Sequence, residues 1–221
     1  MKKCTWFLVF CFVLSTACVE AAGKDKTVPF DFPDLKQEDV AKRYVKHAFK
    51  DRKNPLFRFE MVFPKDWKAI NIKEPTELPD DGTFVEIGAF HRFRTPNNPK
   101  SDILAAIYIT AVRVPADWSD VQAVDKAAEH LLKGHRFNVL QSREYKLSRT
   151  TLKDMLITYR VPKDKAYWSR ITGFKVKDET GAPQKAKKDI LYLVQLNTSE
   201  KDYKAFAAEA FYVAKVTLRL E

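Results

Sequence analysis

The sequence predicts an α+β fold in which a largely antiparallel β-sheet is flanked by helices. Apolar runs with a period of two follow one another along the chain, turn-forming segments connect several of them, and helical patterns intervene in only a few places. Antiparallel strands can be joined by a short turn, whereas parallel strands need a long crossover. This order therefore favours an antiparallel sheet, and we expect a single domain over residues 34–221.

A first helix is predicted directly after a short linker, residues 23–33. Asp34 can cap this helix, Gln37 stands three residues further on as in a capping box, and the helix is expected to continue to about Phe49. Its narrow apolar stripe consists of Val40, Tyr44 and Ala48. His47 lies in the basic string around this stripe, so we expect its side chain to be solvated.

The period changes to two from Pro55 onward. The first strand has four apolar residues on one face, namely Phe57, Phe59, Met61 and Phe63. Pro64 ends this strand because proline cannot donate a hydrogen bond to a ladder. Residues 103–112 are apolar on both alternating sets, which predicts a central strand with helices over both faces. The later strands are expected at Phe84–Phe93, Ile103–Val114, Arg136–Leu147, Met155–Val161, Trp168–Val176 and Ile190–Leu196.

Two further helices are predicted to cover the sheet. Ser119 and Gln122 form a capping box before residues 120–133, and Gly134 stands where a C-cap glycine is expected. The last helix is expected to start in the same way, with Ser199 and Asp202. Its wide buried stripe consists of Tyr203, Phe206, Ala207, Ala210 and Ala214.

The stretch FRFEMVFPKDW, Phe57–Trp67, joins an aromatic strand to a proline and then a tryptophan. With the order of strands and helices from about residue 55 to 220, it resembles the opening of PsbP-like domains, which include small bacterial envelope proteins. The resemblance implies an α/β/α sandwich with a non-enzymatic role in binding or assembly. Trp67 is expected to fold back as an apolar plug at the end of the sheet. The extra N-terminal helix and the basic balance depart from the family pattern.

Residues 1–22 have the pattern of a secretory signal peptide, with a basic start, an apolar run and a small-residue exit. Cleavage after Ala21 or Ala22 releases a soluble chain, whereas cleavage before Cys18 leaves a lipid-anchored one. The small-residue exit favours release. All three cysteines lie in this leader, so the mature domain has no internal disulfide. We expect an extracytoplasmic protein, periplasmic or secreted, that is not integral to the membrane.

The net charge of the chain is +10, and loss of the leader lowers it by one. A basic exported protein is drawn to anionic lipid, anionic polysaccharide or an acidic protein partner. Nucleic acid is not expected in this compartment. Because the cations are dispersed among acidic residues, simple solubility also explains the balance.

The sequence contains none of the standard catalytic or cofactor-binding motifs. It lacks a glycine-flanked serine elbow, a phosphate loop, a dinucleotide fingerprint and a paired-histidine zinc helix. His130 and His135 stand on either side of Gly134 and are not expected to share a metal ion. We therefore expect no enzymatic activity and no cofactor, with an exported hydrolase whose residues converge only in the tertiary structure as an alternative.

Two hairpin loops carry the candidate binding residues. The first loop, residues 94–102, extends a strand end, and its candidates are His91, Arg92, Arg94 and Lys100. The arginine forks suit carboxylate or phosphate groups, although an exposed hairpin made soluble by charge is the simpler interpretation. The second loop, within residues 175–189, contributes Lys185, Lys187 and Lys188, which suit an acidic partner or block edge pairing.

The leading hypothesis is an envelope binding or assembly module that holds a protein partner through its sheet edge and basic loops. The alternative of an anionic lipid or polysaccharide binder requires the cations of both loops to form one contiguous patch.

Overall fold

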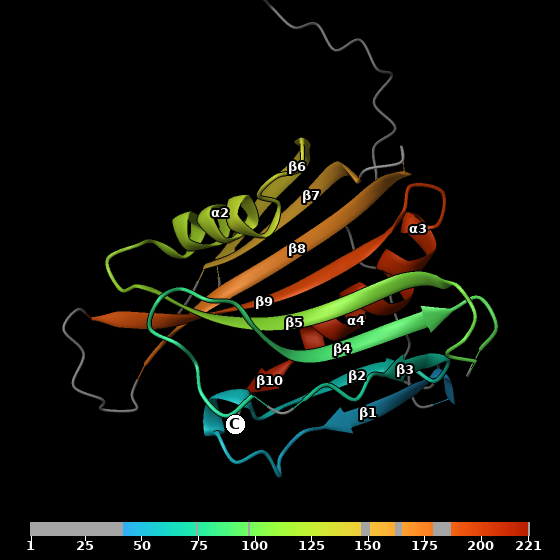
Figure 1. Ribbon diagram of the computed structural model, residues 1–221, viewed down its shortest axis with the longest axis horizontal. Helices are drawn as coiled ribbons and strands as arrows, with labels where there is room; N and C mark the ends of the chain where they lie inside the picture. Colours follow the sequence, from blue (N-terminus) through green and yellow to red (C-terminus); the bar gives the residue numbers. More distant parts are fainter. Residues whose placement is uncertain are drawn as a thin grey trace, which may run out of the picture.

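The computed structural model describes residues 42–73, 75–96, 98–146, 151–161, 165–178 and 187–220. A seven-stranded sheet has the order β3-β4-β5-β9-β8-β7-β6, and a three-stranded sheet has the order β1-β2-β10 (Figure 1). Every strand pairing described is antiparallel. The prediction of an α+β fold built on an antiparallel sheet is therefore confirmed.

The predicted strands are present, and several extend beyond their expected bounds. The large sheet contains β3 (Trp67–Ala69), β4 (Val85–Phe93), β5 (Ile103–Pro115), β6 (Phe137–Lys146), β7 (Thr151–Val161), β8 (Lys165–Lys177) and β9 (Lys188–Ser199). The small sheet contains β1 (Tyr44–Ala48), β2 (Phe59–Pro64) and β10 (Arg219–Leu220). The four apolar residues of the first predicted strand are buried, and a short 3-10 helix, Pro55–Phe57, precedes β2.

The predicted first helix is wrong over residues 44–48, because Tyr44–Ala48 is strand β1, whereas residues 42 and 43 are helical. This strand pairs with β2, with Val45 opposite Phe63. Tyr44 is buried, and its hydroxyl donates to the carbonyl of Glu209 at 2.9 Å. Tertiary pairing with β2 thus overrides the helical spacing of the apolar stripe. Residues 34–41 of the predicted helix lie outside the described residues.

His47 does not have the solvated side chain that the helical interpretation implied. Its ring meets Phe90 edge-on, with centroids 5.1 Å apart, and contacts Phe63 in the same way. Burial lowers the pKa of His47. The neutral ring is therefore the favoured form between β1 and the large sheet.

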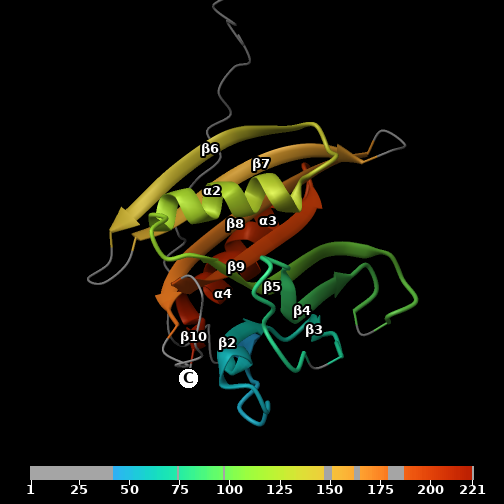
Figure 2. The ribbon, with the colours of Figure 1, turned by 60° about the vertical axis from the view of Figure 1, so that its left-hand side comes forward.

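Strand β5 is central, as its continuous apolar sequence predicts, because β4 and β9 flank it. Helix α2 (Asp120–Leu131) covers one face of the large sheet, over β7, β8 and β9. The C-terminal helical segment lies on the opposite face (Figure 2). Strand β2 packs on that second face as well, so the expectation of helices alone over both faces is correct only in part.

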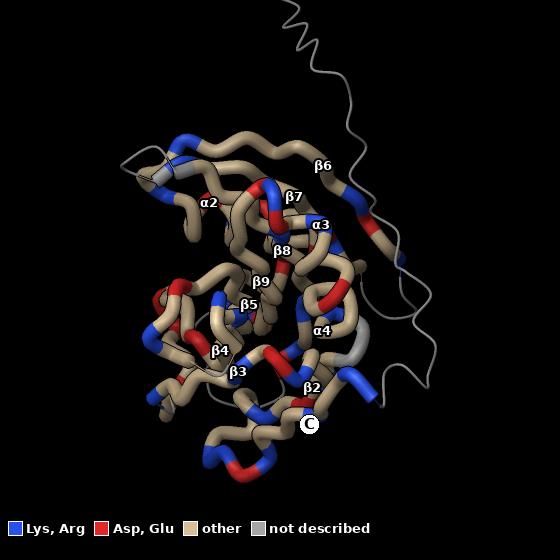
Figure 3. The backbone as a smooth tube through the Cα atoms, turned by 90° about the vertical axis from the view of Figure 1, so that its right-hand side faces the viewer, with Lys and Arg blue, Asp and Glu red and all other residues tan. Residues whose placement is uncertain are grey.

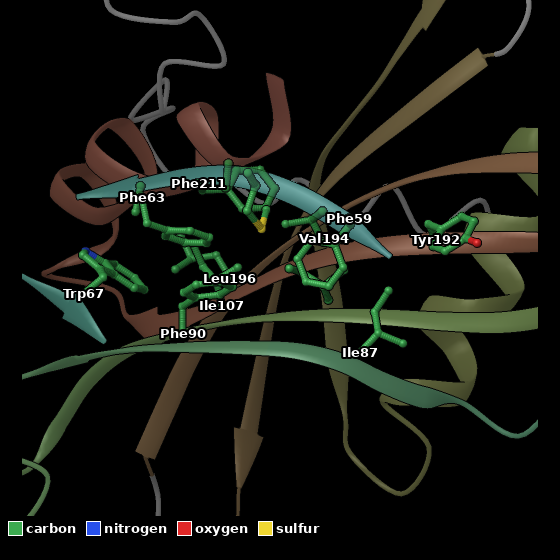
Figure 4. Packing of buried hydrophobic residues seen from close by; sticks show 14 of the residues in the cluster. Phe59, Phe63, Trp67, Ile87, Phe90, Ile107, Tyr192, Val194, Leu196 and Phe211 are labelled. Carbon is green, nitrogen blue, oxygen red and sulfur yellow. The ribbon is translucent and has the colours of Figure 1, made fainter. Parts of the chain in front are cut away.

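The face under β2 holds an aromatic core, shown in Figure 4. Phe63 stacks on Phe90 with ring centroids 3.8 Å apart. Trp67 is buried and meets Phe206 edge-on at 5.9 Å, so the predicted plug is confirmed. This core includes side chains of the small sheet, the large sheet and the C-terminal helical segment, so these three parts pack together.

Helix α2 begins as predicted. Ser119 is its N-cap, and the side-chain oxygen accepts a hydrogen bond from the backbone N–H of Gln122 at 3.1 Å. Gly134, just beyond the helix, has a φ of +87°, a conformation that glycine adopts without steric cost. This turn leads directly into β6.

The C-terminal segment consists of α3 (Tyr203–Phe206), a π-helical stretch (Ala207–Phe211) and α4 (Tyr212–Thr217). Its predicted stripe is buried. The predicted cap is wrong, because Ser199 is the last residue of β9 and its hydroxyl donates to the Asp202 carboxylate at 2.6 Å. A π-turn shifts the register of the helix face, and such turns often accompany functional or strained positions.

Candidate partner-binding surfaces

In and next to the first predicted loop, both arginines form ion pairs with carboxylates of the same chain. Arg92 lies on β4, and its guanidinium is 2.8 Å from the carboxylate of Asp66. Arg94 is 3.1 Å from Asp102 across the hairpin. Both arginine forks thus already hold a carboxylate of the chain itself. Lys100 is exposed at the hairpin tip.

Arg92 also faces the C-terminal helical segment. Burial and the neighbouring charge of Asp66 raise the pKa of Glu209, and Arg92 opposes this shift. The guanidinium therefore balances two carboxyl groups that come from different elements. This arrangement favours a structural role for Arg92 beside the predicted role in binding.

His91 lies on the other side of β4, next to Phe93 as the alternation predicted. Its ring also meets Tyr108 edge-on at 5.9 Å. Burial lowers the pKa of His91, so the neutral form is favoured. The Nε2 atom is buried and has no hydrogen-bond partner among the described residues.

The second predicted loop lies at the other end of the sheet. Lys187 is exposed, and Lys188 begins β9 opposite Pro115, the last residue of β5. Lys188 donates to the backbone carbonyl of Asp80. Phe93 pairs with Ile103 at the opposite end of β5, roughly 40 Å away at the usual rise per strand residue.

The described cations of the two loops therefore do not form one contiguous patch. Lys185 and Cys18 lie outside the described residues, so their predicted roles stay predictions. The lipid or polysaccharide hypothesis required a joined patch, and the fold separates its two halves.

A different surface stands out at the edge of the large sheet. Strand β6 is ten residues long, lies last in the strand order, and is exposed along most of its length. Val139 and Leu140, which are adjacent in sequence, are 48% and 47% exposed. Figure 3 shows a long uncharged stretch of β6, and the charges of this strand, Arg143, Glu144 and Lys146, lie in its last four residues.

A pocket of about 740 Å³ opens beside the beginning of this edge; we call it the β6 pocket. Strands β6, β7 and β8 all contribute to it, and Glu200 closes it from the end of β9. Its lining includes Arg136, Asn138, Leu140, Thr158, Arg160 and Trp168. Trp168 is half-buried and rests against Tyr203, with ring centroids 5.1 Å apart. The pocket thus combines an aromatic wall with two arginines and one carboxylate.

A buried ionic cluster, which we call the Arg170 network, lies between the sheet and the C-terminal helix. The Arg170 guanidinium donates from Nε and Nη2 to the two oxygens of Asp154, at 2.9 and 2.7 Å. Lys215 donates to the same carboxylate at 2.7 Å. Arg170 and Asp154 have no solvent exposure at all. Tyr203 and Tyr212 complete the network by accepting hydrogen bonds from Arg170.

The protonation states in this network follow from burial and from Asp154. Burial opposes the charge on Arg170, but the hydrogen bonds and the negative charge of Asp154 outweigh it and keep the pKa of Arg170 above its ordinary value. Burial lowers the pKa of Lys215, and Asp154 only partly offsets that shift. Burial raises the pKa of Tyr203 to about 12.

The network also reaches strand β6. The ammonium of Lys215 lies 4.8 Å from the ring centroid of Tyr145, which β6 contributes. The exposed edge strand and the C-terminal helix are therefore linked through one buried cation.

A second pocket, of about 350 Å³, lies between α2 and the chain before β4. Phe84 stacks on His130 at one wall, with ring centroids 5.0 Å apart, and Trp118 lies at another. Arg113 lines it too, but its guanidinium is bound to Asp178 and Asp80. His130 therefore packs against an aromatic ring, and no group of three or more potential metal ligands occurs among the described residues.

Sequence reasoning missed both the Arg170 network and the β6 pocket. Asp154 was placed just before a strand predicted to start at Met155, although β7 begins at Thr151. A charge inside an apolar strand, such as Arg170 in WSRITGF, was the available signal for a buried ion pair. The β6 pocket had no local signal, because its residues come from separate strands.

No helix in the described part of the chain is long and apolar enough to span a membrane. No family model and no curated protein matches the sequence.

Three solved structures resemble the fold. One is LpqN, involved in cell envelope biogenesis of Mycobacterium tuberculosis, with a TM-score of 0.49 and 11% identity over 84% of this chain and 97% of that one. Another is cyanobacterial PsbP from Synechocystis sp. PCC 6803, with a TM-score of 0.48 and 9% identity over 86% and 98%. The third is the Ran-binding protein Mog1p of Saccharomyces cerevisiae, with a TM-score of 0.40 and 15% identity over 73% and 89%.

Proposed function

We propose that this chain is an exported, non-catalytic module of the cell envelope that binds or assembles with a protein partner. The observation that carries the proposal is the exposed edge of β6. An edge strand presents a row of unpaired backbone donors and acceptors, and proteins normally shorten, charge or cover such an edge. Here seven of the ten residues of β6 are exposed, Val139 and Leu140 among them.

The remaining surfaces fit this role better than catalysis. Arg92, Arg94 and Arg113 are each held by a carboxylate of the chain. Arg170 and Asp154 of the Arg170 network are fully buried, so their charges serve the packing of the fold and do not face a substrate in solvent. A partner that covers β6 would use the sheet as a rigid platform, consistent with a module that positions another protein.

The test is a pull-down from envelope extract with the mature chain at two salt concentrations. We expect stoichiometric recovery of one protein, largely retained at the higher salt because backbone hydrogen bonds and apolar contacts are weakly screened. A matched control carries Lys100→Gln, which changes an exposed cation outside the edge. Salt-sensitive retention on anionic lipid or glycan without a protein, or turnover of a substrate without a partner, would contradict the proposal.

The form of the mature protein is a separate part of the proposal. Release after the small residues leaves a free chain, whereas lipidation of Cys18 anchors the module to the membrane surface. Intact mass spectrometry of the mature protein distinguishes the two, because a lipidated N-terminus adds the mass of its acyl chains. We expect the unlipidated mass.

A further inference from the structure

The two edge strands of the seven-stranded sheet differ in length. Strand β3, at one edge, has only three residues. Strand β6, at the other, has ten. Short edge strands and charged side chains are the common protections against pairing with another chain. Residues 137–142, the first six of β6, contain no charge, and a β-bulge interrupts this edge between Val139 and Gln141.

Leu140 connects this edge with the β6 pocket. The register of β6 against β7 shifts between Val139 and Gln141, so Leu140 is the extra residue of a β-bulge. Leu140 is nearly half exposed and also lines the pocket. A strand laid along β6 would therefore pass beside the pocket, next to Leu140.

The arginines of the pocket differ from other arginines of the chain. Arg92, Arg94 and Arg170 each reach a carboxylate within 3.1 Å. Arg136 and Arg160 are exposed, line the β6 pocket, and form no ion pair or side-chain hydrogen bond within the described residues. A guanidinium fork matches a carboxylate in a bidentate way, so the pocket has a free binding group for a carboxylate.

Glu200 limits which anion suits this pocket. Glu200 is a lining residue of the same pocket, so its charged lining consists of two arginines and one glutamate. A multiply charged anion would meet repulsion from Glu200, whereas a single carboxylate gains the two arginines at a smaller penalty. The charge pattern thus favours an acidic peptide over a polyphosphate or a densely charged glycan.

We propose that β6 binds an extended segment of the partner protein by strand addition, with a carboxylate of that segment held by Arg136 and Arg160. The inference rests on the proposed function and names the chemistry of the partner. The six-residue uncharged stretch of β6 spans roughly 20 Å, and a bound segment would pair with it on either side of the bulge at Leu140. Backbone hydrogen bonds supply affinity, and the pocket supplies selectivity for the acidic and apolar side chains.

The probe is a fluorescein-labelled eight-residue peptide of alternating threonine and valine that ends in aspartate, with an amidated C-terminus. A second peptide has asparagine in place of aspartate, and a third has asparagine with a free C-terminal carboxylate. We expect the aspartate peptide to bind the mature chain at least about tenfold more tightly than the amidated asparagine peptide, as one good charge-assisted contact predicts. The third peptide shows whether a terminal carboxylate serves equally.

Two controls separate the pocket from the edge. In the double variant Arg136→Gln with Arg160→Gln, the aspartate and asparagine peptides should bind alike, whereas Arg94→Gln with Lys100→Gln should keep the preference. A peptide methylated on alternate backbone nitrogens should lose binding, because it cannot donate to the β6 carbonyls. Amide chemical shifts of residues 137–146 and the guanidinium signals of Arg136 and Arg160 should move on titration of the unmodified peptide.

Several outcomes overturn the inference. They are absence of binding at 1 mM peptide, equal binding of the methylated peptide, retained acid preference in the double arginine variant, or shift changes confined to other strands. Slow hydrogen exchange of the outward β6 amides without peptide would show that the chain or a second copy already covers the edge. Full capture of an envelope partner by the double arginine variant would remove this inference and leave the proposed function standing, whereas capture of no partner by the unmodified chain removes the proposed function.

Discussion

The two faces of the large sheet are covered by different chemistry. On one face, α2 packs Ala123, Val124, Ala127 and Ala128 onto an apolar surface that includes Ile157 and Ile171. On the opposite face, the C-terminal segment meets the same strands, β7 and β8, through the Arg170 network (Figure 2). Adjacent residues, Met155 and Asp154, therefore serve a dry apolar interface and a buried ionic one.

The two faces contribute differently: the apolar face mainly stabilises the fold, and the ionic face mainly positions the C-terminal segment. Apolar burial stabilises roughly in proportion to area and has little directional preference. A buried ion pair gains little net free energy over an apolar replacement, because desolvation of the charges offsets their attraction. The hydrogen bonds around Asp154, however, are satisfied in one arrangement of the helix, so we expect the ionic face to set where the C-terminal segment lies.

The largest expected effect comes from breaking the ionic face. Asp154→Ala leaves Arg170 and Lys215 buried without their carboxylate, so the free energy of unfolding should fall by about 3–5 kcal/mol. Chemical denaturation at pH 7 measures the change. The matched control is Asp125→Ala, which removes a carboxylate from the other face.

A second variant sharpens this prediction. Asp154→Leu with Arg170→Met and Lys215→Met replaces the whole ionic set by apolar side chains. It should recover most of the stability lost in Asp154→Ala, since no charge is left unpaired. A triple variant as unstable as the single one would show that the charges themselves hold the fold together.

Alkaline pH should weaken the ionic face through its tyrosines. Burial raises the pKa of Tyr203 to about 12 from an ordinary value of 10.0, so the folded state keeps a proton that the unfolded state loses. The stabilisation is complete below pH 10 and is lost as pH rises from 10 to 12, amounting to at most about 2.7 kcal/mol. Unfolding free energies measured across this range should fall less steeply in Tyr203→Phe.

Lys215 changes the free energy of unfolding in the opposite direction, at pH values below 10.5. Burial lowers the pKa of Lys215, so between its folded value and 10.5 the unfolded state binds more protons and stability rises with pH. Lys215→Met should abolish this rise. A variant that leaves both parts of the pH profile unchanged would mean that these groups are solvated in solution.

The apolar face should be sensitive to volume instead of charge. A Cβ on Gly173 of β8 would lie 2.6 Å from Leu193 and 2.8 Å from Val124 of α2. Gly173→Ala should therefore lower the free energy of unfolding by about 1–3 kcal/mol, with no added dependence on pH or salt. Val124→Ala, placed in the Gly173→Ala background, should be less harmful than in the unmodified chain, because the added methyl fills its space.

The smallest effect belongs to the rim of the apolar face. Lys153 lies 2.6 Å from Asp125, whose side chain is 41% exposed. Because solvent screens the Asp125 carboxylate while the Lys153 side chain is only 9% exposed, Asp125→Asn should cost about 1–2 kcal/mol, less than Asp154→Ala, and the difference should shrink in 1 M salt. A loss as large as that of Asp154→Ala would erase the distinction between the two faces.

Some elements of the fold could be predicted from the sequence, and others could not. The alternation in β2 and the continuous apolar run of β5 predicted strands with the correct buried faces, because the period of the side chains is a local property. Ser119 predicted the start of α2 for the same reason, since a cap acts within one turn. The β1 segment was misassigned, because its helical spacing is weaker than its pairing with β2.

The predicted binding residues depended on distances that the sequence does not contain. Arg92 was correctly placed at the end of a strand, but its ion pair with Asp66 requires β3 and β4 to be neighbours. The separation of Lys188 from Lys100 depends in the same way on the register of β5 with β9. Both facts follow from strand order, which a local pattern does not set.

The sequence by itself determined the class of fold, the buried face of most strands and the cap of α2, because these depend on spacing within one helical turn or a few strand residues. Only the tertiary structure decided which edge of the sheet stays open and which charges are sealed. The order of the strands left β6 without an outer neighbour in the described chain and brought Lys215 to Asp154, although 61 positions separate them in sequence. Contacts of that range depend on how whole elements pack, and packing is a property of the assembled chain.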